Sequence, residues 1–124
     1  MNGTVEEWVE KAEADLATAR RESAAQDAPN HDAVCFHAQQ CVEKLMKALL
    51  IHLDEVPPRS HDLVHLGELL GKRCRDWTWP LDQLRLVSRS AVAYRYPGES
   101  ADREDAEEAL ALAEAMCRKL KSLL

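Results

Sequence analysis

The sequence is poor in glycine, proline and aromatic residues, and it contains no long uninterrupted apolar run. It has 4 glycines and 5 prolines, and its aromatic side chains are one Phe, three Trp and two Tyr. Because no stretch approaches about 20 apolar residues, we expect no membrane span. The scarcity of aromatic residues and the abundance of Ala and Leu favour helices over strands. These absences together predict an all-α protein that does not enter a membrane.

Further absences narrow the function. The glycines are isolated, so the chain has no glycine-rich phosphate-binding loop. The cysteines, Cys35, Cys41, Cys74 and Cys117, show no CxxC spacing, and we expect them to be reduced and mostly buried. The net charge of −6 argues against a protein that binds nucleic acid over its whole surface, but it leaves room for a local basic groove. We expect no cofactor.

The length of 124 residues suits a single domain, residues 1–124, with one hydrophobic core. The N-terminus has no basic and then apolar signal sequence, because Glu6, Glu7 and Glu10 follow almost at once. We therefore expect a cytoplasmic protein.

Hydrophobic periodicity predicts five helices and no strand. The expected limits follow capping and breaking residues, namely Thr4 to about Glu22, His31 to Leu53, Ser60 to Lys72, Pro80 to the stop at Pro97, and Asp102 onward. The second helix is apolar on more than one side, so we expect it to be the central one. An antiparallel up-and-down bundle of four to five helices follows.

The predicted central helix also carries a polar seam, which consists of Gln39, Gln40, Glu43 and Lys44. We expect these side chains to form hydrogen bonds between helices. In the next helix His61 and His65 are four residues apart, which is the spacing of two metal ligands on a helix. No third ligand is evident nearby, so we expect no metal site, with His61 capping the helix and His65 exposed.

The end of the predicted fourth helix concentrates basic and aromatic side chains, namely Arg85, Arg89, Arg95, Tyr94 and Tyr96. Arg85 and Arg89 are four residues apart and therefore project from the same face. Guanidinium groups suit phosphate recognition, and a neighbouring tyrosine can stack on a base. The alternative is structural: Arg85 and Arg89 are surface residues that pair with Asp82 or with the acidic last helix. Residue chemistry alone leaves both interpretations open.

Three segments, taken in this order, resemble the HEPN family of small helical domains. They are CFHAQQCVEKLMKALL at 35–50, SHDLVHL at 60–66 and SRSAVAYRYPGES at 88–100. The resemblance covers nearly the whole chain and implies a bundle of four or five helices that usually forms a homodimer. Many HEPN domains are metal-independent ribonucleases whose active cleft forms where two copies meet.

The family's hallmark is an Arg followed, after a few residues, by a His, and in the toxin branch by one further residue and a Tyr. Arg89 matches the Arg, Tyr94 stands at the histidine position, Arg95 is the spacer and Tyr96 matches the tyrosine. The resemblance therefore implies a catalytic pair of Arg89 and Tyr94. However, tyrosine titrates near 10, which weighs against the usual ribonuclease chemistry at neutral pH.

In the toxin branch a small nucleotidyltransferase attaches AMP to the motif tyrosine, so the resemblance also implies such a partner and modification at Tyr96. Three functions stay open. The first is a homodimeric regulatory module, of the toxin–antitoxin kind, that binds a nucleotide or RNA through Arg85, Arg89, Arg95 and Tyr96. The second is a toxin-like endoribonuclease that uses Arg89 with Tyr94 or His61. The third is a non-catalytic helical adaptor. We expect the first.

Overall fold

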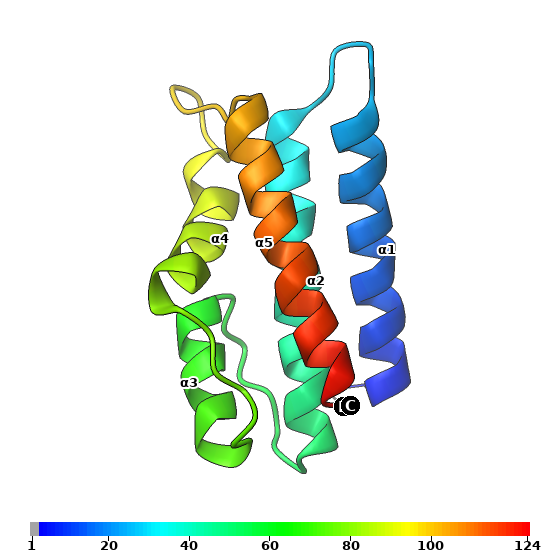
Figure 1. Ribbon diagram of the computed structural model, residues 1–124, viewed down its shortest axis with the longest axis vertical. Coiled ribbons are helices and arrows are strands. Elements are labelled where there is room, and N and C mark those ends of the chain that lie inside the picture. The colour runs from blue at the N-terminus through cyan, green and yellow to red at the C-terminus, as the bar shows by residue number, and fades with distance from the viewer. Residues whose placement is uncertain (1–2) are drawn as a thin grey trace.

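The computed structural model describes residues 3–124 and shows a bundle of five helices (Figure 1). They are α1 (Val5–Ala24), α2 (His31–His52), α3 (Leu63–Arg73), α4 (Leu81–Ala93) and α5 (Arg103–Ser122). Residues 3–124 contain no strand. The predicted all-α class and helical bundle are confirmed. None of these helices combines the length and apolar character that crossing a lipid bilayer requires.

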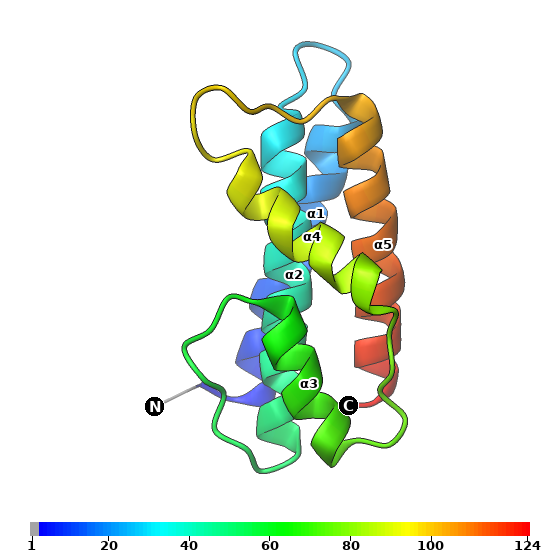
Figure 2. The same cartoon turned by 90° about the vertical axis from the view of Figure 1, so that its left-hand side faces the viewer.

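The four longer helices alternate in direction along the chain, while the short α3 runs the same way as α2 (Figure 1). The view from the side shows α4 crossing the bundle obliquely, with the start of α3 beside its middle (Figure 2). A hydrogen bond from the Leu63 amide to Ser88 Oγ, 3.1 Å long, joins the two helices at this point. The chain segment that precedes α3 is thereby fixed next to α4.

Capping side chains set the predicted helix starts. Thr4 and Glu7 form a capping box at α1, with the Glu7 amide donating to Thr4 Oγ1 over 3.1 Å. Asp102 and Asp105 form a second capping box at α5, with the Asp105 amide 2.7 Å from Asp102 Oδ1. Both arrangements satisfy amide groups that lack a partner within the helix.

Two predicted helix limits are wrong. The third helix is capped by Asp62, not Ser60, because Asp62 Oδ1 accepts from the Val64 amide over 2.9 Å. Ser60 Oγ instead accepts from the Asp62 amide, one step before the helix. The fourth helix ends at Ala93, so the chain has already turned where we expected its last helical residues.

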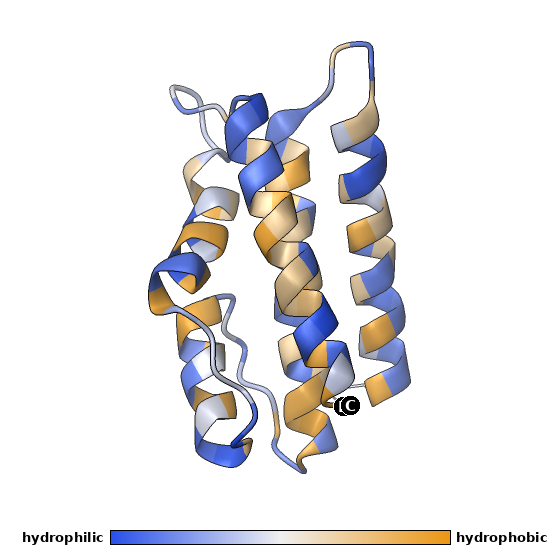
Figure 3. Ribbon diagram, in the orientation of Figure 1, coloured by the Kyte–Doolittle hydropathy of each residue, from blue (hydrophilic) through white to orange (hydrophobic). Residues whose placement is uncertain are grey.

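The core is organised around α2, which contacts each of the other four helices. Of its 22 residues 13 are buried, against 3 of 20 in α1, so the predicted central helix is confirmed. Figure 3 shows α1 alternating between hydrophilic and hydrophobic positions, as a helix with one buried face should. Trp77 is also buried and stacks on Trp79 with ring centroids 5.8 Å apart, so the loop between α3 and α4 helps to close the bundle.

The four cysteines are free thiols, and three of them are buried as predicted. Burial raises the pKa of Cys35 to about 11. The Sγ atoms of Cys41 and Cys117 are 2.8 Å apart between α2 and α5. This hydrogen bond, with burial, raises the pKa of Cys117. Thiols in such surroundings are packing groups and poor nucleophiles.

Candidate functional site

A pocket of about 550 Å³ lies between the start of α3 and the middle of α4. Its lining residues are His61, Asp62, Val64, Arg85, Ser88, Arg89 and Val92. Arg85 and Arg89 both line it, as their spacing of four residues on one helix predicts. Two of the predicted ligand-binding residues therefore share one cavity with a histidine from another element.

Arg85 and Arg89 are both exposed, and within residues 3–124 neither forms an ion pair or a side-chain hydrogen bond. Other arginines of the protein do find carboxylates: Arg20 lies 2.7 Å from Glu114, and Arg73 lies 2.6 Å from Glu55. Both are therefore surface residues, as the structural alternative expects, but the ion pairs with Asp82 or with the acidic last helix do not form within the described residues. Arg89 does border a pocket together with Asp105 and Glu108 of α5. Two guanidinium groups thus line this pocket without an acceptor from the part of the chain that the structure describes.

His61 is held in the segment before α3 and does not cap that helix, contrary to expectation. Its ring Nδ1 lies 3.1 Å from both carboxylate oxygens of Glu43. Its backbone oxygen accepts from Gln39 Nε2 over 3.1 Å. The side chain is nevertheless 79 % exposed.

The carboxylate that orients His61 is buried inside the bundle. The Glu43 side chain is 4 % exposed and accepts from Gln39 Nε2 at 3.0 Å and from Lys47 Nζ at 3.2 Å, in addition to His61. Lys47 is itself 8 % exposed, and its ammonium group lies 5.8 Å from the centre of the Trp8 ring. Lys47 was not among the predicted residues, although its distance of four residues from Glu43 is the spacing of a helical ion pair.

The predicted polar seam of α2 divides over two faces, and only one of them bonds to another helix. On one face Gln39 and Glu43 reach His61, with Gln40 Nε2 bonded to Gln39 Oε1 at 2.9 Å. On another, Lys44 pairs with Asp15 of α1. The residues that line the pocket include His61 but none of the seam residues, so the seam supports the pocket from behind.

The remaining predicted site residues lie elsewhere. Tyr94 lines a second, smaller pocket of about 200 Å³, which Arg89 borders as well. Burial and the Asp105 carboxylate raise the pKa of Tyr94, which moves it further from neutral pH. Arg95 and Tyr96 are exposed beyond the end of α4 and line neither pocket. Within one chain, the four motif residues therefore do not line a single pocket. These residues are Arg89, Tyr94, Arg95 and Tyr96.

The histidine pair considered as metal ligands does not form. His61 precedes α3 whereas His65 lies within it and is exposed, so the two do not share a helical face. In the part of the chain that the structure describes, no three His, Cys, Asp or Glu side chains gather as a metal site would need.

Known proteins share this fold and this sequence pattern. The family model of the HEPN domain matches residues 5–123. The chain belongs to the HEPN domain family. The crystal structure of TT1696 from Thermus thermophilus is 26 % identical, covers 100 % of both chains and superposes with a TM-score of 0.79. The structure of ST0689, described as an archaeal HEPN homologue, is also 26 % identical, covers 97 % of both chains and gives a TM-score of 0.69. No curated protein matches the chain.

Proposed function

We propose that this HEPN protein binds the phosphate groups of a nucleotide or an RNA in the pocket between α3 and α4. The observation that carries the proposal is that Arg85 and Arg89 line this pocket without a carboxylate partner. Guanidinium groups match phosphate oxygens in geometry and charge. A volume of about 550 Å³ lies in the usual range for small-molecule sites.

The rest of the assignment extends this binding function. We propose that the protein acts as a homodimer, and that a nucleotidyltransferase partner modifies Tyr96 with AMP in a toxin–antitoxin arrangement. Two observations support these steps. Tyr96 is 65 % exposed in the turn after α4, so an enzyme can reach its hydroxyl group. Leu81 and Val92 of α4 are 45 % and 57 % exposed, and exposed apolar side chains on one helix suit a subunit contact.

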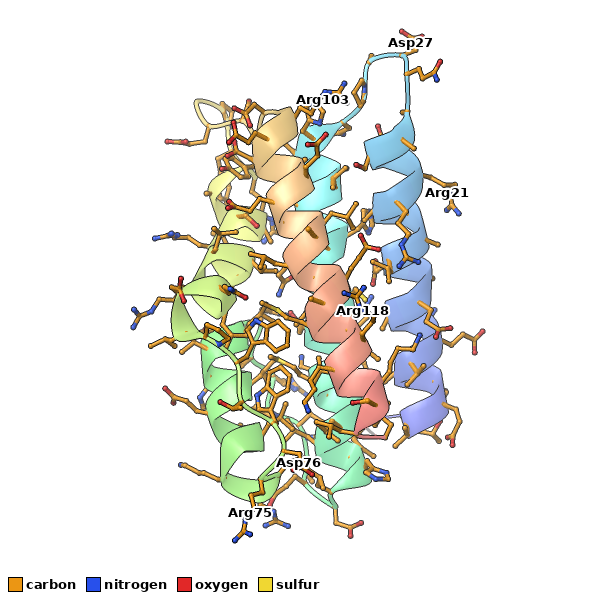
Figure 4. The ribbon with its side chains drawn as sticks, in the orientation of Figure 1. Arg21, Asp27, Arg75, Asp76, Arg103 and Arg118 are labelled. Atoms are coloured by element: carbon orange, nitrogen blue, oxygen red, sulfur yellow. The ribbon has the colours of Figure 1, made fainter. Side chains whose placement is uncertain are left out.

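Fluorescence anisotropy with a labelled single-stranded RNA, at several salt concentrations, tests the binding proposal. Unlabelled AMP, ATP and RNA serve as competitors, which separates a free nucleotide from a polynucleotide. We expect Arg85→Ala and Arg89→Ala each to weaken binding and to lower the salt slope by about one phosphate contact. Arg118→Ala is the matched control, because Arg118 is an exposed arginine of α5 outside the pocket (Figure 4). Equal affinities in all three variants would refute the proposal.

The second candidate is a metal-independent endoribonuclease. The observation that favours it is the position of His61, which shares a pocket with both Arg85 and Arg89, whereas Tyr94 shares a smaller pocket with Arg89 alone of the two. A histidine in this place can take the role that the raised pKa of Tyr94 denies to the tyrosine.

Mass spectrometry of the purified protein with and without a co-expressed nucleotidyltransferase would test the modification of Tyr96 separately.

A further inference from the structure

The smaller pocket, of about 200 Å³, lies between the second half of α4 and the first two turns of α5. Its two walls carry opposite charges. The wall from α4 includes Arg89, Ser90, Leu86 and Ala93, and the wall from α5 consists of Asp105 and Glu108. Because the volume is below the roughly 300 Å³ at which sites for drug-sized molecules begin, the pocket suits a ligand of few non-hydrogen atoms.

The charges of the two walls do not neutralise each other. Within residues 3–124 neither Arg89 nor Glu108 forms an ion pair or a side-chain hydrogen bond, although both line the pocket. The Asp105 carboxylate is held at the wall, because its Oδ2 accepts from the Asp102 amide over 3.0 Å. A ligand that satisfies both walls must therefore carry a negative group on one side and a positive group on the other.

The other lining residues indicate what joins these two groups. The Ser90 hydroxyl donates to the Val87 carbonyl oxygen over 3.0 Å, so the lone pairs of Ser90 Oγ are left to accept from a ligand. Leu86 and Ala93 supply apolar surface in the same pocket. A guanidinium group binds a carboxylate through two parallel hydrogen bonds, and carboxylates and a hydroxyl oxygen accept from an ammonium group. A carboxylate, an ammonium group and a short apolar side chain together make an α-amino acid.

We propose that the pocket between α4 and α5 binds a small free α-amino acid as its zwitterion, with the carboxylate on Arg89 and the ammonium group on Asp105 and Glu108. Arg89 also lines the pocket between α3 and α4. The amino acid and a phosphate therefore compete for one guanidinium group, and each lowers the affinity for the other. This competition rests on the proposed phosphate binding, whereas the amino-acid site does not.

An NMR titration of the ¹⁵N-labelled protein with L-alanine tests the site. L-Lactate, which lacks the ammonium group, and L-alaninamide, which lacks the carboxylate, are the matched ligands. We expect L-alanine to bind at least about tenfold more tightly than either, because each loses hydrogen bonds to a charged group. The shifted amide signals should lie at the end of α4 and the start of α5. No shift with L-alanine overturns the inference, and equal binding of L-lactate reduces the site to a simple anion contact and also overturns it.

Variants of the two walls locate the contacts. Arg89→Ala and Glu108→Gln should each weaken L-alanine binding at least about tenfold. Glu107→Gln is the matched control, because Glu107 is an exposed neighbour on α5 that makes the same change in net charge outside the pocket. Arg85→Ala should also keep the wild-type affinity, since Arg85 lines only the pocket between α3 and α4. Unchanged binding in Glu108→Gln would contradict the assignment of the ammonium group.

The competition is measured by the anisotropy of a labelled single-stranded RNA at rising L-alanine concentration. A zwitterion adds no net charge to the solution, so it does not act as added salt does. We expect L-alanine to lower the RNA affinity of the wild type and to leave that of Glu108→Gln nearly unchanged. An RNA affinity that L-alanine does not alter overturns the sharing of Arg89. Absence of any RNA binding overturns the proposed function, while the amino-acid site is still decided by the NMR titration.

Discussion

Two histidine–carboxylate–lysine groups lie on two faces of α2, and they differ in what surrounds them. In one, His37 Nδ1 lies 2.8 Å from Asp15, which also pairs with Lys44. In the other, His61 Nδ1 lies 3.1 Å from Glu43, which also pairs with Lys47. The chemical groups are the same. A histidine–carboxylate pair therefore does not by itself indicate a function, since the His37 group simply joins α1 to α2.

The difference lies in burial of the carboxylate and exposure of the ring. Glu43 is 4 % exposed and Asp15 is 11 % exposed, whereas the ring of His61 is 79 % exposed and that of His37 is 29 % exposed. Of the two histidines, His61 shares a pocket with Arg85 and Arg89, which form no ion pair within residues 3–124. The His61 group thus holds an exposed ring at a pocket lined by arginines, and the His37 group joins two helices.

The largest difference between the two groups should be seen when the carboxylate of each is removed and the loss of stability is compared. We expect Glu43→Ala to lower the free energy of unfolding by about 3–5 kcal/mol, because Lys47 is left buried without a counter-charge. Asp15→Ala should cost about 1.5 kcal/mol, because His37 and Lys44 are part-exposed and regain water. Urea denaturation of both variants measures the difference. Equal losses would show that burial does not distinguish the groups.

A double-mutant cycle for each lysine–carboxylate pair sharpens the comparison. Replacing Glu43 and Lys47 singly and together should give a coupling free energy of about 2 kcal/mol, near the upper part of the range for residues in one network. The cycle for Asp15 and Lys44 should give about 0.5 kcal/mol, as is usual for ion pairs that water reaches. Both cycles use the midpoints and slopes of urea unfolding curves. A larger coupling free energy for Asp15 and Lys44 than for Glu43 and Lys47 would contradict this expectation.

The bundle was predictable because its signals are local. Thr4 and Glu7, three residues apart, predict the start of the first helix. The apolar character of α2 on several sides predicts its central position. The same kind of signal failed at the end of α4. Pro97 restricts the residue before it, and the chain leaves the helix at Ala93, a few residues earlier than the proline requires.

The candidate site was predictable only in part because its members come from three elements. Arg85 and Arg89 share a helix face by spacing alone, so their proximity followed from the sequence. The position of His61 depends instead on how the segment with Pro57 and Pro58 returns to α2, and on the bonds from Gln39 and Glu43. Such contacts between distant residues have no period in the sequence. They arise only when the core is packed.

The smallest expected effect concerns a carboxylate that is exposed, at the start of α5. The amide of Asp105 donates to Asp102, and this bond lowers the pKa of Asp102 below its ordinary value of 3.8. The ionised form is thus favoured in the folded protein, so its contribution to stability is present above pH 3.8 and is lost as the pH falls through the lowered pKa. Asp102→Asn keeps a good cap without this titration. Its melting temperature should therefore fall slightly less than that of the wild type between about pH 4 and pH 2. Identical acid profiles would mean that the cap, unlike Glu43, holds its helix through geometry and not through charge.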